Sequence, residues 1–292
     1  MIAVLGPGGV GGLLAAALAR AGEQVVVVAR EETATRIAER GIEVRSVRLG
    51  DFVARPRAVS ELREPAGALI VATKAVALDA ALHRVTAPPA LVVPLLNGLD
   101  HVHALRTRFG AEHVCAGAIR VECDRPQPGV VVQTSPFLRV DLAPRRLATE
   151  QFAAELEGAG IPARVLDSEA EVMWGKLVRL NALACATSAF DRPLGPIRGD
   201  PQMREQLERC VEEAAAVARA EGAEVAPASV MGELEAAHGT LGSSMNRDIA
   251  AGREPELDAI PGAVLRAASR HGLECPTIAG LVAKIRARLE AA

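Results

Sequence analysis

Three glycines near the start of the chain have the spacing of a phosphate-binding loop. Gly6, Gly8 and Gly11 form a G-x-G-x-x-G pattern directly after the apolar run 2–5. In such a loop the first glycine allows a tight turn and the second lets backbone amides approach a pyrophosphate, while the third allows close packing of helix on strand. The N-terminus of the following helix attracts the anion. We therefore predict a dinucleotide site formed by Gly6, Pro7, Gly8, Gly9, Val10 and Gly11, the alternative being glycines that serve only a tight strand–helix turn.

Basic residues follow two of the expected strands. Arg30 stands at the end of the second strand, where a protein that prefers NAD carries an acidic residue for the ribose hydroxyl. A guanidinium instead suits a 2′-phosphate, which it binds in a bidentate manner. This favours NADP(H), although Arg30 could be a surface charge while Glu31 or Glu32 binds the ribose. Lys74 follows the strand at 68–72 and is either a second phosphate contact or an exposed lysine at a helix start.

The elements that position these residues indicate an α/β fold in the first part of the chain. Short runs rich in Val, Ile and Leu alternate with helical stretches, which is typical of βαβ units in a doubly wound, Rossmann-type domain. We expect strands at 2–5, 24–28, 68–72 and 91–95. Between 114 and 142, strand-like pieces broken by residues 124–129 suggest an antiparallel edge or hairpin that closes the sheet. A helix at 148–158 and a strand at 163–166 complete this NADP-binding domain, residues 1–167.

The composition changes after Asp167, where Ala, Glu, Leu and Arg recur at helical spacing. This pattern predicts a C-terminal all-α domain, residues 168–292. We assign substrate binding and dimerisation to this domain as an expectation. The expected helices cover residues 169–188, 201–221, 228–237, 257–271 and 278–291. Because ligands of α/β domains bind at the carboxyl ends of the strands, we expect the active site in a cleft between the two domains.

The composition argues against several other functions. The formal net charge is −3 and no dense basic run occurs, so nucleic acid is not an expected partner. The apolar runs fall well short of the roughly 20 residues that cross a bilayer. Five widely spaced cysteines indicate reduced thiols and a cytoplasmic protein. His101, His103 and His113 lack acidic or cysteine partners at ligand spacing, so no metal is expected.

Five segments, together with the glycine loop and Arg30, give the chain a family resemblance over nearly its whole length. They are VATKA at 71–75, PLLNGLDH at 94–101, MWGKL at 173–177, and SSMNRD and REPELD within 243–258. With them the chain resembles the ketopantoate reductases (2-dehydropantoate 2-reductases). The resemblance implies reduction of ketopantoate to pantoate with NADPH, in pantothenate and coenzyme A biosynthesis. It implies that Lys176 is the catalytic acid and that Glu256 pairs with it and orients the substrate hydroxyl.

The resemblance also implies a set of substrate contacts. Ser244 falls where a hydroxyl contacts the substrate carboxylate, and Asn97 where an amide reaches the nicotinamide or the substrate. From the residues alone, capping or turn chemistry explains Ser244 and Asn97 equally well.

The chain departs from the family pattern on the helix that carries the lysine. Where the family commonly has asparagines four and eight residues after the lysine, this chain has Leu180 and Ala184. Asn181 is the neighbouring candidate, one residue of helical rotation away.

Three functions remain open at this stage: a ketopantoate reductase, an NADPH-dependent reductase of another branched 2-keto acid, and a non-catalytic NADP(H)-binding sensor. The joint presence of Lys176 and Glu256 favours an enzyme. The expected partner is a small 2-keto acid; a homodimer is a candidate assembly, which the sequence alone does not decide.

Overall fold

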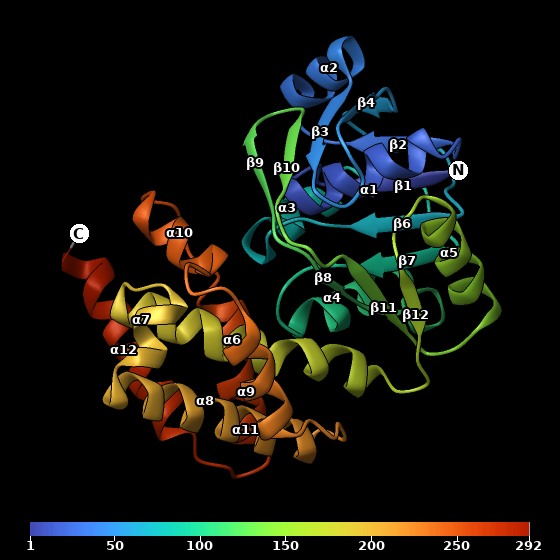
Figure 1. The fold of residues 1–292 in the computed structure, drawn as a ribbon. Coiled ribbons are helices and arrows are strands. Elements are labelled where there is room, and N and C mark those ends of the chain that lie inside the picture. The colour runs from blue at the N-terminus through green and yellow to red at the C-terminus, as the bar shows by residue number, and fades with distance from the viewer. Residues whose placement is uncertain (292) are drawn as a thin grey trace. The chain divides into compact units, whose positions relative to one another are not determined.

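The computed structural model describes residues 1–291, which form two compact units. The first comprises Met1–Leu96 and His101–Val172, and the second comprises Asn97–Asp100 together with the chain from Met173 onward. In Figure 1 the first unit contains the strands and the second is helical. Among residues 1–291, no helix has the length and apolar character that a membrane crossing requires.

A five-stranded parallel sheet is the centre of the first unit. Its strands are β1 (Ile2–Leu5), β2 (Val25–Val28), β5 (Arg57–Val59), β6 (Ala68–Val71) and β7 (Leu91–Pro94), in the order β5-β2-β1-β6-β7. Four of these runs are buried along their whole length, as expected for a sheet that helices cover on both faces. The predicted doubly wound domain is therefore confirmed, with the apolar runs as its inner strands (Figure 1).

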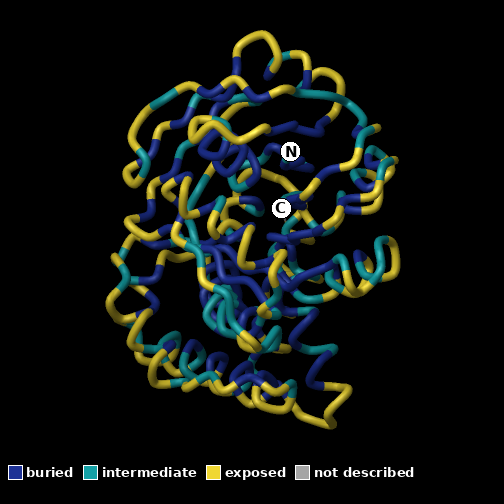
Figure 2. Tube along the Cα trace, turned by 90° about the vertical axis from the view of Figure 1, so that its right-hand side faces the viewer, coloured by how far each residue is buried: buried dark blue, intermediate teal, exposed yellow. Residues whose placement is uncertain are grey.

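Alternate residues of the sheet pack into two separate cores. On one face Ile2, Val4 and Val27 pack with α1 (Gly9–Arg20) and α5 (Leu147–Gly158). On the other face Ala3 and Leu5 pack with α3 (Leu78–Leu82) and α4 (Asp100–Phe109). The remaining helical segments here are α2 (Glu31–Arg40), η1 (Ala75–Ala77) and η2 (Ala111–His113). In Figure 2 the buried segments lie toward the interior, and the exposed ones are connecting loops and the outer turns of helices.

Two smaller sheets complete the first unit. One has the order β4-β3-β10-β9 and contains β3 (Ile42–Ser46), β4 (Phe52–Ala54), β9 (Cys123–Gln127) and β10 (Val130–Gln133). The other has the order β12-β11-β8 and contains β8 (Ala116–Arg120), β11 (Arg139–Ala143) and β12 (Ala163–Val165). Strands β3, β4 and β5 were not expected from the sequence.

The expected hairpin exists, but it belongs to a different sheet from the one predicted. Strands β9 and β10 are antiparallel, yet β10 pairs with β3 and the hairpin does not close the parallel sheet. Residues 124–127 also do not break a strand, because they lie within β9 itself. Pro126 is tolerated there since β9 is an edge strand, where a missing backbone donor costs no ladder bond.

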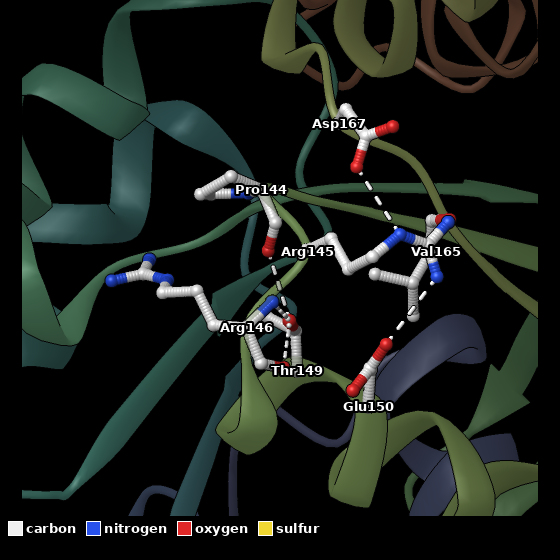
Figure 3. Close-up of polar contacts among 7 residues, drawn as sticks. All are labelled: Pro144, Arg145, Arg146, Thr149, Glu150, Val165 and Asp167. Carbon is white, nitrogen blue, oxygen red and sulfur yellow. Dashed lines mark hydrogen bonds and ion pairs between the residues drawn. The ribbon is translucent and has the colours of Figure 1, made fainter.

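A dense polar cluster fixes the start of α5 (Figure 3). Thr149 Oγ1 accepts a hydrogen bond from the backbone nitrogen of Arg146 at 2.9 Å and donates one to the Pro144 carbonyl at 2.9 Å. The Arg145 guanidinium reaches Asp167 at 3.1 Å, Glu150 at 3.3 Å and the Val165 carbonyl at 2.5 Å. These bonds attach the end of β12 to the first turn of α5.

The second unit is built from helices alone. They are α6 (Glu169–Phe190), α7 (Leu194–Gly199), α8 (Pro201–Ala220), α9 (Pro227–Ala236), α10 (Ser244–Ala250), the π-helical turn η3 (Asp258–Gly262), α11 (Ala263–Arg270) and α12 (Pro276–Ala291). The predicted all-α character is confirmed, with α6 beginning in the first unit. Two short helices, α7 and α10, lie in segments where the sequence analysis expected no helix.

Candidate functional site

The glycine loop joins β1 to α1 in a backbone arrangement that excludes larger residues. Gly6 has φ +89°, and a Cβ added to it would lie 2.7 Å from the Thr73 side chain. A Cβ on Gly11 would lie 2.2 Å from the Gly6 carbonyl oxygen, so α1 crosses directly over the turn. The two glycines therefore serve the tight turn and the close helix–strand packing that the spacing predicts.

The same loop leaves space where a pyrophosphate would lie. A Cβ on Gly8 would meet only the Ala72 carbonyl oxygen, at 3.9 Å, and Gly8 precedes the first residue of α1. Nearby, Thr73 Oγ1 is buried and has no hydrogen-bond partner among residues 1–291. Buried hydroxyls in native proteins nearly always have a partner, so this one is suited to a bound group. These residues fit a dinucleotide, and Thr73 is a candidate site residue that the sequence analysis missed.

The hairpin β9–β10 supports the loop from the side. The Cys123 thiol donates a hydrogen bond to the Gly9 carbonyl at 3.1 Å, and a Cβ on Gly9 would lie 2.8 Å from the Cys123 carbonyl oxygen. Burial raises the pKa of the Cys123 thiol to about 12, so the sulfur keeps its proton and remains a donor. No sequence motif pointed to this contact, because Cys123 lies 114 residues from Gly9.

Arg30 and Lys74 both lie at the carboxyl edge of the parallel sheet. Arg30 is the exposed residue that precedes α2, after β2, and Lys74 is exposed before η1, after β6. Since β2 and β6 are the two neighbours of β1, the topology brings both cations to the edge where the glycine loop lies. Glu31 and Glu32 form the first turn of α2 and are exposed as well.

Three residues predicted for the active site form one hydrogen-bonded network within the second unit. The ammonium of Lys176, on α6, donates to Asn97 Oδ1 at 2.9 Å. The amide nitrogen of Asn97 in turn donates to Glu256 Oε2 at 2.8 Å. Lys176 and Asn97 are half-buried, and Glu256 is 9% exposed. The amide thus bridges a cation and a carboxylate, and these two contacts fix which side of the amide faces each of them.

Asn181 does not join this network. Its side chain is fully buried, donates to Cys210 Sγ at 3.4 Å and accepts from Cys185 Sγ at 3.6 Å. Five residues separate Asn181 from Lys176, which is a rotation of about 140° around the helix, so the two side chains leave opposite sides. The Asn181 side chain thus lies in the helical core. This position does not fit its predicted role as a substrate contact.

The remaining predicted substrate residue is Ser244 on α10, and the two departures from the family pattern lie on α6. Ser244 is exposed at the first position of α10, whereas its neighbour Ser243 is buried and caps the helix by accepting from the Asn246 backbone nitrogen at 3.0 Å. Leu180, one turn after Lys176, is partly exposed, while Ala184 is fully buried. Of the two departures from the family pattern, only Leu180 presents surface to a ligand.

The histidines considered as metal ligands do not come together into a cluster. Across residues 1–291, no group of three or more His, Cys, Asp or Glu side chains is arranged to hold a metal ion. His101 is buried on α4, and His113 pairs with its neighbour Glu112 at 3.6 Å.

Two family models match nearly all of the chain. Residues 2–144 match the family described as "Ketopantoate reductase PanE/ApbA", and residues 170–289 match its C-terminal model. The chain belongs to the ketopantoate reductase family. It is accordingly an oxidoreductase of the 2-dehydropantoate 2-reductase type, and the resemblance inferred from the sequence motifs is confirmed.

Individual ketopantoate reductases are similar over the full length. A 2-dehydropantoate 2-reductase of Caulobacter vibrioides is 32% identical, with 98% of both chains covered. The crystal structure of 2-dehydropantoate 2-reductase from Geobacter metallireducens has a TM-score of 0.90 at 26% identity, covering 98% of this chain and 99% of that one. A ternary structure of D-mandelate dehydrogenase with NADH and anilino(oxo)acetate has a TM-score of 0.89 at 22% identity, covering 99% and 98%. This last likeness shows the fold alone.

Proposed function

We propose that this protein reduces 2-dehydropantoate to pantoate with NADPH, with Lys176 as the general acid. The observation that supports this most directly is the network in which Asn97 joins the Lys176 ammonium to the Glu256 carboxylate. Family membership supports the same reaction class and argues against a non-catalytic sensor.

The network has the parts that ketone reduction requires. A nicotinamide cofactor supplies the hydride that converts the keto carbon to an alcohol. The oxygen of that carbonyl gains negative charge as the reaction proceeds, and a nearby cation or proton donor stabilises it. Lys176 provides both, because an ammonium carries the charge and can give up a proton. Asn97 restrains the ammonium, and Glu256 offers a carboxylate that can accept from the substrate hydroxyl.

The cofactor class is a nicotinamide dinucleotide, and we propose NADPH as its form. The glycine loop and the start of α1 provide the pyrophosphate site, and Thr73 Oγ1 is an unused hydroxyl beside it. Arg30 at the end of β2 provides the positive charge that a 2′-phosphate requires. Lys74 at the end of β6 is a second phosphate contact in this proposal.

Leu180 favours a second candidate, the reduction of another branched 2-keto acid. It is partly exposed on α6 one turn beyond Lys176, so an apolar side chain stands where the family commonly has an amide. A site that hydrogen-bonds a substrate hydroxyl discriminates strongly against analogues that lack it, and an apolar site does not. Leu180 therefore lowers the expected preference for a hydroxylated substrate.

The deciding assay follows the loss of near-ultraviolet NADPH absorbance with purified protein and a panel of 2-keto acids. The panel includes 2-dehydropantoate and its analogues without the hydroxyl, and each is repeated with NADH. Preferred turnover of 2-dehydropantoate with NADPH supports the proposal. Preferred turnover of an analogue supports the second candidate, and no turnover despite NADPH binding contradicts both.

A further inference from the structure

The segment that carries Asn97 is pressed against the π-helical turn η3. Gly98 has φ +87°, and a Cβ added to it would lie 2.1 Å from the Ala259 carbonyl oxygen. The two backbones are therefore in direct contact, and no other residue type fits at Gly98 without a shift. π-Helical turns occur frequently at functional sites, and this one begins two residues after Glu256.

One arginine holds the two segments together from the outer side. Arg266, on α11, donates to Asp100 Oδ2 at 2.5 Å, to Asp258 Oδ1 at 2.6 Å and to the Asp258 carbonyl at 3.0 Å. A Cβ on Gly262 would lie 3.1 Å from both Arg266 Nη1 and Asp258 Oδ1, so the guanidinium lies over that glycine. Arg266 thus links Asp100, three residues after Asn97, to Asp258, two residues after Glu256.

We propose that Arg266 is a positioning residue that holds the Asn97 amide between Lys176 and Glu256. This inference rests on the proposed function, since it assigns Arg266 a role in preparing that site. A planar guanidinium can donate to two carboxylates at once in a fixed geometry, which a lysine cannot reproduce. The Arg266 side chain is 41% exposed and the Asp258 side chain 88%, and exposed ion pairs add little to overall stability. Its contribution is therefore local to the amide bridge.

The kinetic test compares Arg266→Ala and Arg266→Lys with Arg270→Ala. Arg270 is a matched control, because it lies one turn further along α11 and also forms an exposed ion pair, with Glu221 at 3.0 Å. A displaced catalytic group costs up to about 100-fold in rate, so Arg266→Ala should lower kcat by about 10- to 100-fold. Arg266→Lys should restore activity only in part. The dissociation constant for NADPH and the melting temperature should stay at wild-type values, and Arg270→Ala should retain wild-type kcat.

A double variant separates positioning from a general structural effect. If Arg266 acts through Asn97, replacing Arg266 in an Asn97→Ala variant should lower kcat hardly any further. Additive losses in the double variant would contradict the proposal, as would wild-type kcat in Arg266→Ala. If Arg266→Ala fails to fold, Asp100→Ala removes one of the two anchors and is expected to give the same reduction in kcat.

A spectroscopic test does not depend on activity. The asparagines of the sequence are Asn97, Asn181 and Asn246, so labelling with [15N]asparagine gives three side-chain amide pairs, of which Asn97→Ala identifies one. Arg266→Ala should shift or broaden the Asn97 pair and leave the other two unchanged, while Arg270→Ala should change none. An unchanged Asn97 pair in Arg266→Ala would overturn the proposal. If wild type reduces no keto acid, the proposed function fails, and this spectrum still tests the role of Arg266.

Discussion

At the level of single residues, the identity of the cation in the network matters as much as its position. Lysine and arginine together number 33 in this chain, and only Lys74, Lys176 and Lys284 are lysines. An arginine retains its proton throughout the physiological range, whereas a lysine can transfer one. A lysine at position 176 in an arginine-rich chain is therefore consistent with a proton donor.

Replacing Lys176 tests both parts of its role. Lys176→Ala should lower kcat by about 10²- to 10⁴-fold, the range typical for loss of a general acid, with NADPH affinity nearly unchanged. Lys176→Arg keeps the charge but not the transferable proton. It should therefore restore only the part of kcat that depends on the positive charge. Steady-state kinetics and fluorescence titration with NADPH measure the two effects. Turnover at the wild-type level in Lys176→Ala would remove this residue from the catalytic role.

Arg30 is the residue on which we propose that the choice of cofactor depends. Arg30→Glu places a carboxylate where the 2′-phosphate of NADPH is proposed to bind, and it offers an acceptor to the free ribose hydroxyl of NADH. The substitution should weaken the binding of NADPH much more than the binding of NADH. The ratio of the two dissociation constants, measured by titration, checks this. Equal weakening of both would show that Arg30 does not contact the phosphate.

At the level of elements, the packing of α1 on the glycine turn gives a test of the loop. Gly11→Ala places a methyl group 2.2 Å from the Gly6 carbonyl oxygen, so α1 must shift. Overpacking of this kind costs about 1–3 kcal/mol of unfolding free energy, and the displaced helix N-terminus should also bind NADPH less tightly. Urea unfolding and cofactor titration measure the two changes.

Gly232 provides the control for this helix substitution. It lies within α9, and an added Cβ would have no neighbour within 4 Å. Gly232→Ala should therefore raise the unfolding free energy, by up to about 1 kcal/mol, because alanine is the better helix former. Similar destabilisation in both variants would mean that the close approach at Gly11 is not the cause.

The elements predictable from sequence were those with a continuous apolar run or a regular helical period. The inner strands of the parallel sheet are continuous apolar runs, and the long helices of the second unit show a regular period. Strand β3 was not predicted because it is not a continuous apolar run: buried Ile42 and Val44 alternate with more exposed Glu43 and Arg45, the period of a strand that is covered on one face. Helix α7 was missed because Gly195 and Pro196 indicate a break when they are considered without tertiary contacts.

The candidate site was predictable only to the extent that it is local in sequence. The glycine loop follows from spacing alone, whereas Lys176 and Glu256 entered through family resemblance. Their connection through Asn97 spans 79 and 159 residues, and no local pattern encodes such a contact. Asn181 was proposed from proximity along the chain, but the rotation of α6 directs it to the cysteines of the core.

At the level of the whole molecule, one buried carboxylate links stability to pH. Asp141, on β11, is buried between Arg139 and Arg164, with Asp141–Arg164 at 2.7 Å. Burial by itself raises the pKa of the Asp141 carboxyl, but the hydrogen bonds and charges of the two arginines together hold this pKa below its ordinary value of 3.8. A depressed pKa means that the stabilisation is complete above about pH 4 and is lost as the pH falls through the folded-state value.

Asp141→Asn should therefore lower the unfolding free energy near neutral pH by about 1–3 kcal/mol, because hydrogen bonds to a charged group are lost. The difference from wild type should shrink as the pH falls below about 4, where the carboxyl of the unfolded chain takes up a proton, and further as the pH passes the lower folded-state pKa. Unfolding by urea across a pH series measures this difference. Asp79→Asn, at an exposed position in α3, should follow wild type at every pH. A difference that stays constant into the acid range would exclude the charge of Asp141 as its source.

The grouping of Asn97–Asp100 with the second unit has a consequence for any attempt to divide or recombine this protein. A gene fragment that starts at Met173 would encode Lys176 and Glu256 but not the amide that joins them. Exchange of the helical part between relatives would pair the lysine and carboxylate of one parent with the asparagine of the other. The site is therefore encoded by two separate segments, and a chimera that takes the tetrapeptide and the helices from one parent keeps their contacts unchanged.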